Sequence, residues 1–226
     1  STSFSNDDYD FSKLGEAWST PRIMRMKIDS KDKWVAVFGA GFNNAVSPEY
    51  GSAVFIIDME DGGKVLKQID VADKSGNSII NSVPVGIIPI IADGSPLANY
   101  HGAMAYFADY EGKLWKLNLS DQGTLYDMQQ LFDAESTGAN GRRVMKDVVA
   151  SIDTDNTLWF YYGTGDQQQL QKVSPSIANR LYGLKDTDFP NYNSSATAFS
   201  VSQCRDVTSK SANCPTDSEK GWYIDL

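Results

Sequence analysis

The stretch Glu111-Gly112-Lys113-Leu114-Trp115-Lys116-Leu117-Asn118-Leu119 decides the fold. A glycine turn precedes it, a Ser-Asp-Gln-Gly turn follows it, and apolar and polar residues alternate between the two. Alternation with a period of two between turn signals is typical of a half-buried β-strand. Similar strands are expected at 51–59, about sixty residues earlier, and at 179–186, about sixty-five residues later.

This recurrence predicts an all-β fold built from repeated sheets. Each repeat contains short apolar or alternating segments separated by Gly, Asp and Asn turns, which indicates four strands in meander order. Four-stranded units that repeat at this period are typical of a β-propeller, in which only neighbouring blades can cover the two apolar faces of each blade. A closed propeller needs about 4–8 blades. The chain is therefore predicted to be an incomplete propeller of about three blades plus the start of a fourth.

The predicted divisions all belong to one propeller domain covering residues 1–226. They are an arm (1–17), a first blade (18–72), a second blade (81–134), a third blade (142–187), a long insertion (188–220) and the start of the next strand (221–226). The alternative is an ordinary β-sandwich in which the similarity between the segments is fortuitous.

Composition excludes several classes of function. The net charge of −9 argues against a nucleic-acid partner, because such binders need a basic surface. The same charge disfavours docking on an anionic membrane. No stretch approaches the roughly 20 consecutive apolar residues that span a bilayer, so no membrane insertion is expected.

The two cysteines, Cys204 and Cys214, lie in a polar loop rich in Ser, Asn and Asp. A metal site would need further ligands, but there is no second cysteine pair and the single histidine, His101, is far away in sequence. A local disulfide between Cys204 and Cys214 is therefore predicted, which indicates an extracytoplasmic protein. Because no signal peptide is visible at the start, the chain is expected to be mature or an excised piece.

Catalytic constellations are weak in this sequence. His101 stands in a polar loop without evidence of the partners that a Ser-His-Asp triad requires. Asp153 and Asp155 could resemble paired catalytic carboxylates, but Asp and Asn are favoured in a turn between two strands. Trp115, Trp159 and Trp222 are expected to fill gaps between sheets. No enzyme activity is predicted.

In collinear order from Trp18 to Leu226, the chain resembles the C-terminal propeller of the PilY/PilC type IV pilus-tip proteins. The segments that carry the resemblance are Trp18-Ser19-Thr20-Pro21, Trp34-Val35-Ala36-Val37-Phe38-Gly39-Ala40-Gly41, Phe55-Ile56-Ile57-Asp58, Ala108-Asp109-Tyr110-Glu111-Gly112-Lys113-Leu114-Trp115-Lys116-Leu117, Phe160-Tyr161-Tyr162-Gly163-Thr164-Gly165 and Gly221-Trp222-Tyr223-Ile224-Asp225-Leu226. Single phrases are also shared with quinoprotein-like propellers, whereas the ordered set is more specific.

The resemblance implies a non-enzymatic factor of type IV pilus biogenesis and adhesion. Its propeller would interact with minor pilins at the pilus tip and support pilus extension, twitching motility and host attachment, with a host-cell surface ligand as a further possible partner. The implied location is extracytoplasmic: the pilus tip, the outer-membrane surface or the periplasm of a Gram-negative bacterium. The long polar loops at 43–50, 92–102 and 185–220 are the expected contact surfaces.

Calcium is the cofactor that the resemblance brings into question. Many family members carry a calcium loop at the position of residues 92–102, with Asp or Asn at alternate positions and a closing carboxylate. Asp93 could be a first ligand, but Ser95 and Leu97 replace the next carboxylates and Ala103 replaces the closing one. No metal and no cofactor are therefore predicted at this loop.

Two alternative functions use similar propellers. A quinone-dependent dehydrogenase would need a vicinal cysteine pair and a calcium ion held by carboxylates, whereas Cys204 and Cys214 are ten residues apart. An outer-membrane assembly scaffold is the other alternative.

Overall fold

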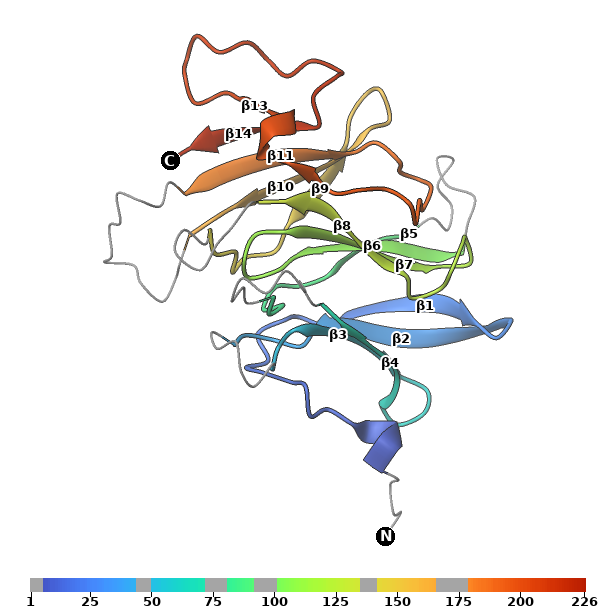
Figure 1. The fold of residues 1–226 in the computed structure, drawn as a ribbon. Helices are drawn as coiled ribbons and strands as arrows, with labels where there is room; N and C mark the ends of the chain where they lie inside the picture. The colour runs from blue at the N-terminus through green and yellow to red at the C-terminus, as the bar shows by residue number, and fades with distance from the viewer. Residues whose placement is uncertain (1–5, 44–49, 72–80, 92–100, 135–141, 166–178) are drawn as a thin grey trace.

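A computed structural model describes residues 6–43, 50–71, 81–91, 101–134, 142–165 and 179–226. Three β-sheets follow one another in chain order and stack face to face, with the first at the bottom of Figure 1 and the third at the top. The strands between residues 22 and 70, 88 and 133, and 149 and 186 lie within the limits expected for the three blades, whereas three further strands, at 199–200, 204–206 and 221–225, lie beyond those limits. Two of the expected contact surfaces, 43–50 and 92–102, lie largely outside the described residues. Only residues 43, 50, 101 and 102 of these loops are described.

The first sheet is an antiparallel meander in the order β1-β2-β3-β4. Its strands are β1 (Arg22–Ile28), β2 (Lys31–Gly39), β3 (Ala53–Asp58) and β4 (Lys64–Asp70). Only Asp29 and Ser30 connect β1 to β2, and both have positive φ angles, 49° and 65°. Two left-handed residues in a two-residue loop match the twist of the flanking strands, so this loop forms a tight hairpin.

The second sheet contains the stretch that decides the fold. Its strands are β5 (Ile88–Ile91), β6 (Gly102–Ala108), β7 (Leu114–Ser120), β8 (Met128–Asp133) and a short added strand, β12 (Phe199–Ser200). Every residue of β6 and β7 is buried. This burial arises because the first and third sheets cover the two faces of the second, so polar positions of β7 are buried as well.

The third sheet has the order β13-β14-β11-β10-β9. Its strands are β9 (Val149–Ile152), β10 (Leu158–Gly163), β11 (Arg180–Asp186), β13 (Cys204–Asp206) and β14 (Gly221–Asp225). Residues 221–226, expected to begin a fourth blade, instead pair antiparallel with β11 and complete the third sheet. The alternating, aromatic sequence of this segment is compatible with the third sheet and with a fourth blade. The pattern indicates a half-buried strand but not the sheet to which the strand belongs.

Aromatic side chains join the second sheet to the third. The ring centroids of Tyr106 and Phe160 are 4.3 Å apart, and those of Phe132 and Tyr182 are 5.2 Å apart. Trp115 is buried as expected, with 7% of its surface exposed. These contacts belong to one hydrophobic core that runs through all three sheets.

The outer faces of the first and third sheets differ. On the first sheet, Phe55 packs against Phe11 of the N-terminal arm at a centroid distance of 5.6 Å. On the third sheet, Trp159, Tyr161 and Trp222 form a half-buried row, with centroid distances of 6.2 and 6.1 Å between neighbours. This row lies on the face turned away from the second sheet, where another blade of a propeller would pack. The arrangement is an open arc of sheets.

Candidate interaction surface

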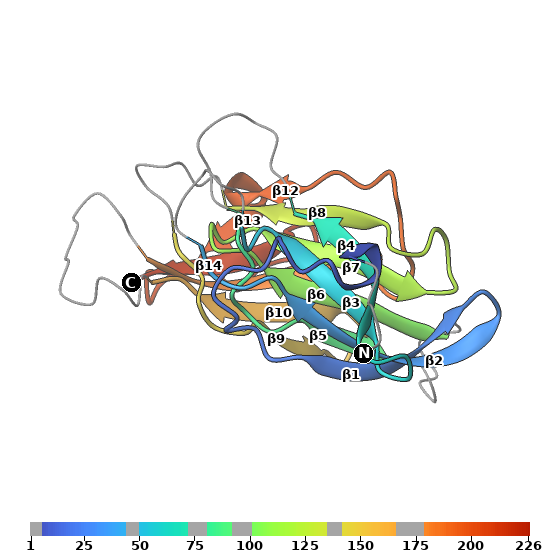
Figure 2. The ribbon, with the colours of Figure 1, turned by 90° about the horizontal axis from the view of Figure 1, so that it is seen from below.

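The expected contact loop at 185–220 is the one that the structure describes throughout, and its residues beyond β11, 187–220, are here called the excursion. The excursion leaves the end of β11 and returns as β14. On the way it runs along the outer strands of the second and third sheets, with β12 beside β8 and β13 beside β14 (Figure 2).

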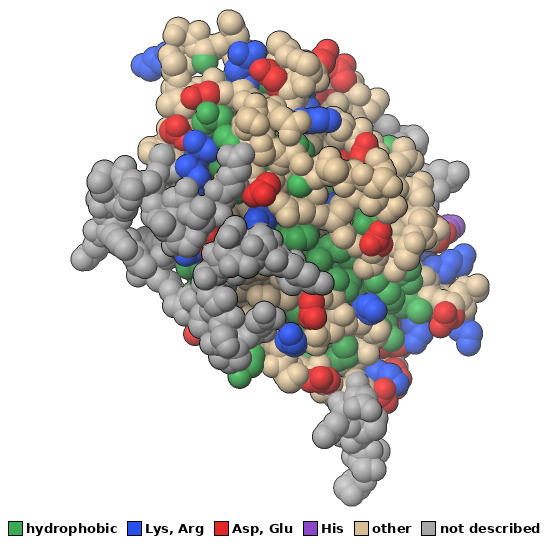
Figure 3. Space-filling view, viewed as in Figure 1, with side chains coloured by type: hydrophobic (Ala, Val, Ile, Leu, Met, Phe, Trp, Pro, Cys, Tyr) green, Lys and Arg blue, Asp and Glu red, His purple; other side chains and the backbone are tan. Residues whose placement is uncertain are grey.

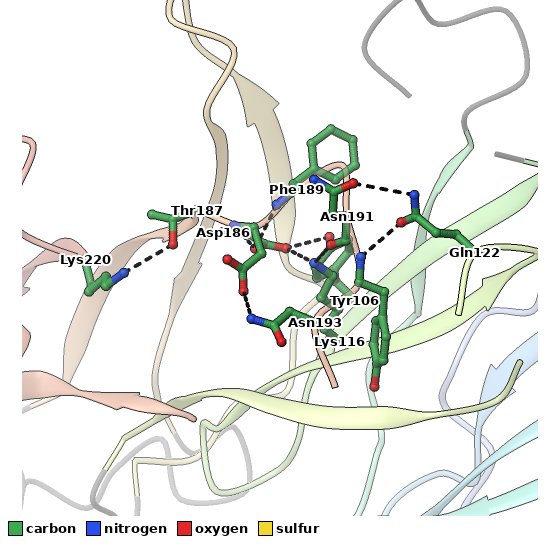
Figure 4. A network of polar contacts seen from close by, with 11 residues as sticks. Tyr106, Lys116, Gln122, Asp186, Thr187, Phe189, Asn191, Asn193 and Lys220 are labelled. Atoms are coloured by element: carbon green, nitrogen blue, oxygen red, sulfur yellow. Dashed lines mark hydrogen bonds and ion pairs between the residues drawn. The ribbon is translucent and has the colours of Figure 1, made fainter. Parts of the chain in front are cut away.

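A buried ion pair fixes the base of the excursion (Figure 4). Lys116 of β7 and Asp186 of β11 are 0% and 1% exposed at their side chains, and their Nζ and Oδ2 atoms are 2.7 Å apart. The Tyr106 hydroxyl donates a second hydrogen bond to the same carboxylate oxygen, at 2.8 Å. Burying two charges is costly unless they are paired and hydrogen-bonded, and this geometry meets both requirements.

The same pair holds the first residues of the excursion. The backbone N–H groups of Asp188 and Phe189 donate to the other oxygen of Asp186, at 3.0 and 3.2 Å. The Lys116 ammonium donates to the Asn191 carbonyl oxygen at 2.7 Å. The second and third sheets and the excursion are therefore tied together at one point.

Apolar side chains of the excursion cover the outer seam between the second and third sheets. Phe189, Tyr192 and Phe199 pack against the shared core, and the ring centroid of Phe199 is 5.3 Å from that of Phe132. At the same place β12 pairs in parallel with β8. The excursion is therefore folded onto the sheets along its first half.

The second half returns through β13, which pairs in parallel with β14. Arg205 and Glu219 form an ion pair of 2.6 Å across this half. A hydrogen bond from the Thr216 backbone N–H, followed by the Arg205 hydrogen bond, lowers the pKa of Glu219. Residues 208–214 beyond these contacts are all exposed. The excursion thus presents an exposed polar tip on an anchored base.

Both cysteines lie in the excursion, and both are free thiols in this structure. Cys204 is partly buried at the start of β13, whereas Cys214 is exposed in the tip. Burial, with a smaller contribution from Glu219, raises the pKa of the Cys204 thiol to about 12. The structure does not contain the disulfide expected between them, and that disulfide stays a prediction.

Two carboxylates close turns by binding a tryptophan six residues later. Asp109 Oδ2 accepts from Trp115 Nε1 at 3.0 Å, and Asp153 Oδ2 accepts from Trp159 Nε1 at 2.7 Å. In each turn the other carboxylate oxygen accepts two backbone N–H groups. Asp153 and Asp155 thus lie in a strand-connecting turn, as expected.

Burial makes Asp109 the more perturbed of these carboxylates. Desolvation raises its pKa to about 6, although hydrogen bonds from Trp115 and Asn81 oppose that rise. The side chain is fully buried beneath the turn between β6 and β7. There it accepts hydrogen bonds from two side chains and two backbone N–H groups, which hold the turn in place.

Within the described ranges, no group of three or more His, Cys, Asp or Glu side chains is placed to hold a metal ion. Asp93, Ser95 and Leu97 lie outside those ranges, and Ala103 is buried in β6. The absence of calcium at 92–102 stays a prediction.

No helix in the described part of the chain has the length and apolar character needed to cross a bilayer.

Comparison with known proteins decides the type of propeller. No protein-family model matches the chain. A curated relative, the type IV pilus biogenesis factor PilY1 homolog of Xylella fastidiosa, is 26% identical over 245 aligned residues, which cover 98% of this chain and 16% of the relative. The crystal structure of the Pseudomonas aeruginosa PilY1 C-terminal domain matches 99% of this chain and 53% of that domain, with a TM-score of 0.69 and 18% identity.

The resemblance to PilY1-type proteins is confirmed. The structural match also confirms the all-β, propeller-type fold, and the absence of closure among the described sheets agrees with an incomplete propeller. The chain spans only a small part of the curated PilY1 homolog and about half of the solved PilY1 domain.

Proposed function

We propose that this chain is part of the C-terminal propeller of a type IV pilus biogenesis factor and acts as a non-enzymatic scaffold. The resemblance to a curated protein named as a type IV pilus biogenesis factor supports a role in pilus biogenesis. The anchored excursion, with its exposed tip at 208–214, carries the assignment of the working surface.

The scaffold role follows from how the excursion is held. A contact loop that is already ordered loses less conformational entropy on binding than a loop that must fold on its partner. The Lys116–Asp186 pair and the seam residues Phe189 and Phe199 supply that order at the base. Minor pilins at the pilus tip are the proposed partners, and a host-cell surface ligand is a further one.

In the cell, this contact would place the protein at the pilus tip or on the outer-membrane surface of a Gram-negative bacterium. There it would support pilus extension, and through extension twitching motility and attachment to host cells. The disulfide between Cys204 and Cys214 would form in that oxidising location and restrain the tip.

The proposal is tested in the source cell by replacing residues 208–214 with a Gly/Ser segment of equal length in the intact protein. Surface pili, twitching and the amount of folded protein are then measured. A loss of pili with normal protein abundance supports the proposal. Normal piliation and twitching would show that residues 208–214 are not needed for the function. The matched control is Ser202→Ala, which changes an exposed residue of the excursion outside the tip.

A further inference from the structure

The three sheets differ in whether a further strand pairs with the last strand of the meander. In the second and third sheets the outermost strand of the meander is not the edge, because β12 adds in parallel to β8 and β13 adds in parallel to β14. Both added strands come from the excursion. The first sheet ends at β4, with no further strand among the described residues.

The backbone of β4 has groups available at that edge. The Val71 N–H donates to the Ser52 carbonyl oxygen at 2.9 Å, so alternate residues of this antiparallel pair direct their backbone groups to β3. The intervening residues, Gln68 and Asp70, therefore direct theirs away from β3. An exposed edge of this kind is a template for a further strand.

The side chains beside this edge are apolar. Leu66 and Ile69 of β4, together with Tyr126 and Met128 at the start of β8, are partly exposed and pack against the core. Figure 3 shows hydrophobic side chains gathered at this height, between the first and second sheets. The corresponding seam between the second and third sheets is covered by Phe189, Tyr192 and Phe199.

The edge carries one exposed charge of each sign, Lys67 and Asp70. Lys67 is exposed, and its ammonium lies 6.0 Å from the centroid of the Tyr126 ring. Lys64 at the start of β4 is paired with Asp8 of the arm at 2.7 Å, so Lys67 is the cation of β4 that has no ion pair among the described residues. A segment that lies on this edge is favoured by acidic residues near Lys67.

We propose that the edge of β4 binds an extended strand of a minor pilin, in parallel, as a fifth strand of the first sheet. The strand would alternate apolar residues, which cover Leu66 and Ile69, with acidic residues beside Lys67. This mode repeats in trans what β12 and β13 do within the chain, and addition of a strand to an exposed edge is a common form of peptide recognition. The inference rests on the proposed function, because it names a second contact for the same partner.

The test measures binding of purified minor pilins of the source cell to the intact protein and to edge variants. Gln68→Pro removes the N–H that points outward while the bonds from β4 to β3 remain, and proline is tolerated on edge strands. Gln68→Ala is the matched control, because it keeps that N–H. Lys67→Glu reverses a charge at the edge, and Lys146→Glu makes the same change at an exposed residue outside both the edge and the tip. Hydrogen exchange at the Gln68 and Asp70 amides reports the contact directly.

The expected result is a rise in Kd of about tenfold or more for Gln68→Pro and for Lys67→Glu, with wild-type binding for Gln68→Ala. Pilin binding should also slow hydrogen exchange at Gln68 and Asp70. If pilins bind both edge variants as tightly as the wild type, the edge proposal is overturned and the proposed function stands. If no minor pilin binds the folded wild-type protein, both the edge proposal and the proposed function are contradicted. Should Gln68→Pro fail to fold, Lys67→Glu and the exchange data decide.

Discussion

The change Lys116→Met should be among the most destabilising single substitutions in this chain. The Lys116 side chain is completely buried, and its ammonium serves both the Asp186 carboxylate and the Asn191 carbonyl oxygen. Methionine has a similar length and no charge, so it removes the cation without opening a large cavity. Asp186 then keeps the Tyr106 hydroxyl and two backbone N–H donors but loses its counter-ion.

Removal of one partner from a buried ion pair costs about 3–5 kcal/mol, because the remaining charge stays in a site that water does not reach. A native domain is stable by only about 5–15 kcal/mol, so this loss is a large share of the total. Urea unfolding followed by circular dichroism measures it. The double variant Lys116→Met, Asp186→Leu should recover part of the loss, because it also removes the uncompensated carboxylate.

Arg205→Met is the matched control for an ion pair nearer the surface. Arg205 and Glu219 are 37% and 20% exposed, so solvent screens their interaction and its loss should cost about 0–1 kcal/mol. The reasoning is refuted if Lys116→Met costs no more than this control. It is also refuted if the double variant is less stable than Lys116→Met by the full effect of Asp186→Leu, because the two residues would then not be coupled.

Three further outcomes follow from individual side chains. Asp109 has a pKa raised by burial from 3.8 to about 6, so the stability that it contributes is complete below about pH 4 and is lost as pH rises through 6. The difference in unfolding free energy between wild type and Asp109→Asn should therefore fall by about 2 kcal/mol from pH 4 to pH 7, and a flat difference would contradict this. In the reduced protein, iodoacetamide should modify exposed Cys214 well before Cys204, whose pKa is about 12, and equal rates by intact mass would contradict this. Gly183→Ala places a methyl group against the Trp222 ring, so it should cost about 1–3 kcal/mol and shift tryptophan fluorescence, whereas unchanged fluorescence and stability would show that the ring moves freely.

Part of the fold can be predicted from the sequence, because a strand with one face in water and one face in the core alternates polar and apolar residues. The strands β3, β7 and β11 lie close to the expected segments 51–59, 111–119 and 179–186. The alternation does not show to which sheet a strand belongs. The sequence therefore predicts a fourth blade beginning at 221–226, whereas β14 completes the third sheet. The two- and three-residue strands β12 and β13 carry no pattern of their own, since their partners are distant in sequence.

The candidate surface was only partly visible. The length and polarity of 185–220 indicate a contact loop, but nothing local indicates its anchor. Lys116 alternates with apolar neighbours and therefore reads as a solvent-facing residue of a half-buried strand. It is buried because the third sheet and the excursion cover that face, and its partner Asp186 is seventy residues away. The signal that remains is a lysine between Trp115 and Leu117, in the centre of a strand with further strands expected on both sides.

The central claim is that the anchored excursion contacts minor pilins. The most direct measurement is a binding isotherm of purified minor pilins against the intact protein, with residues 208–214 either native or replaced by a Gly/Ser segment. We expect saturable binding that weakens at least tenfold on replacement, while circular dichroism shows both proteins folded. Equal binding by the two folded proteins would contradict the role of the tip, and no saturable binding by the native protein would contradict the pilin partnership itself.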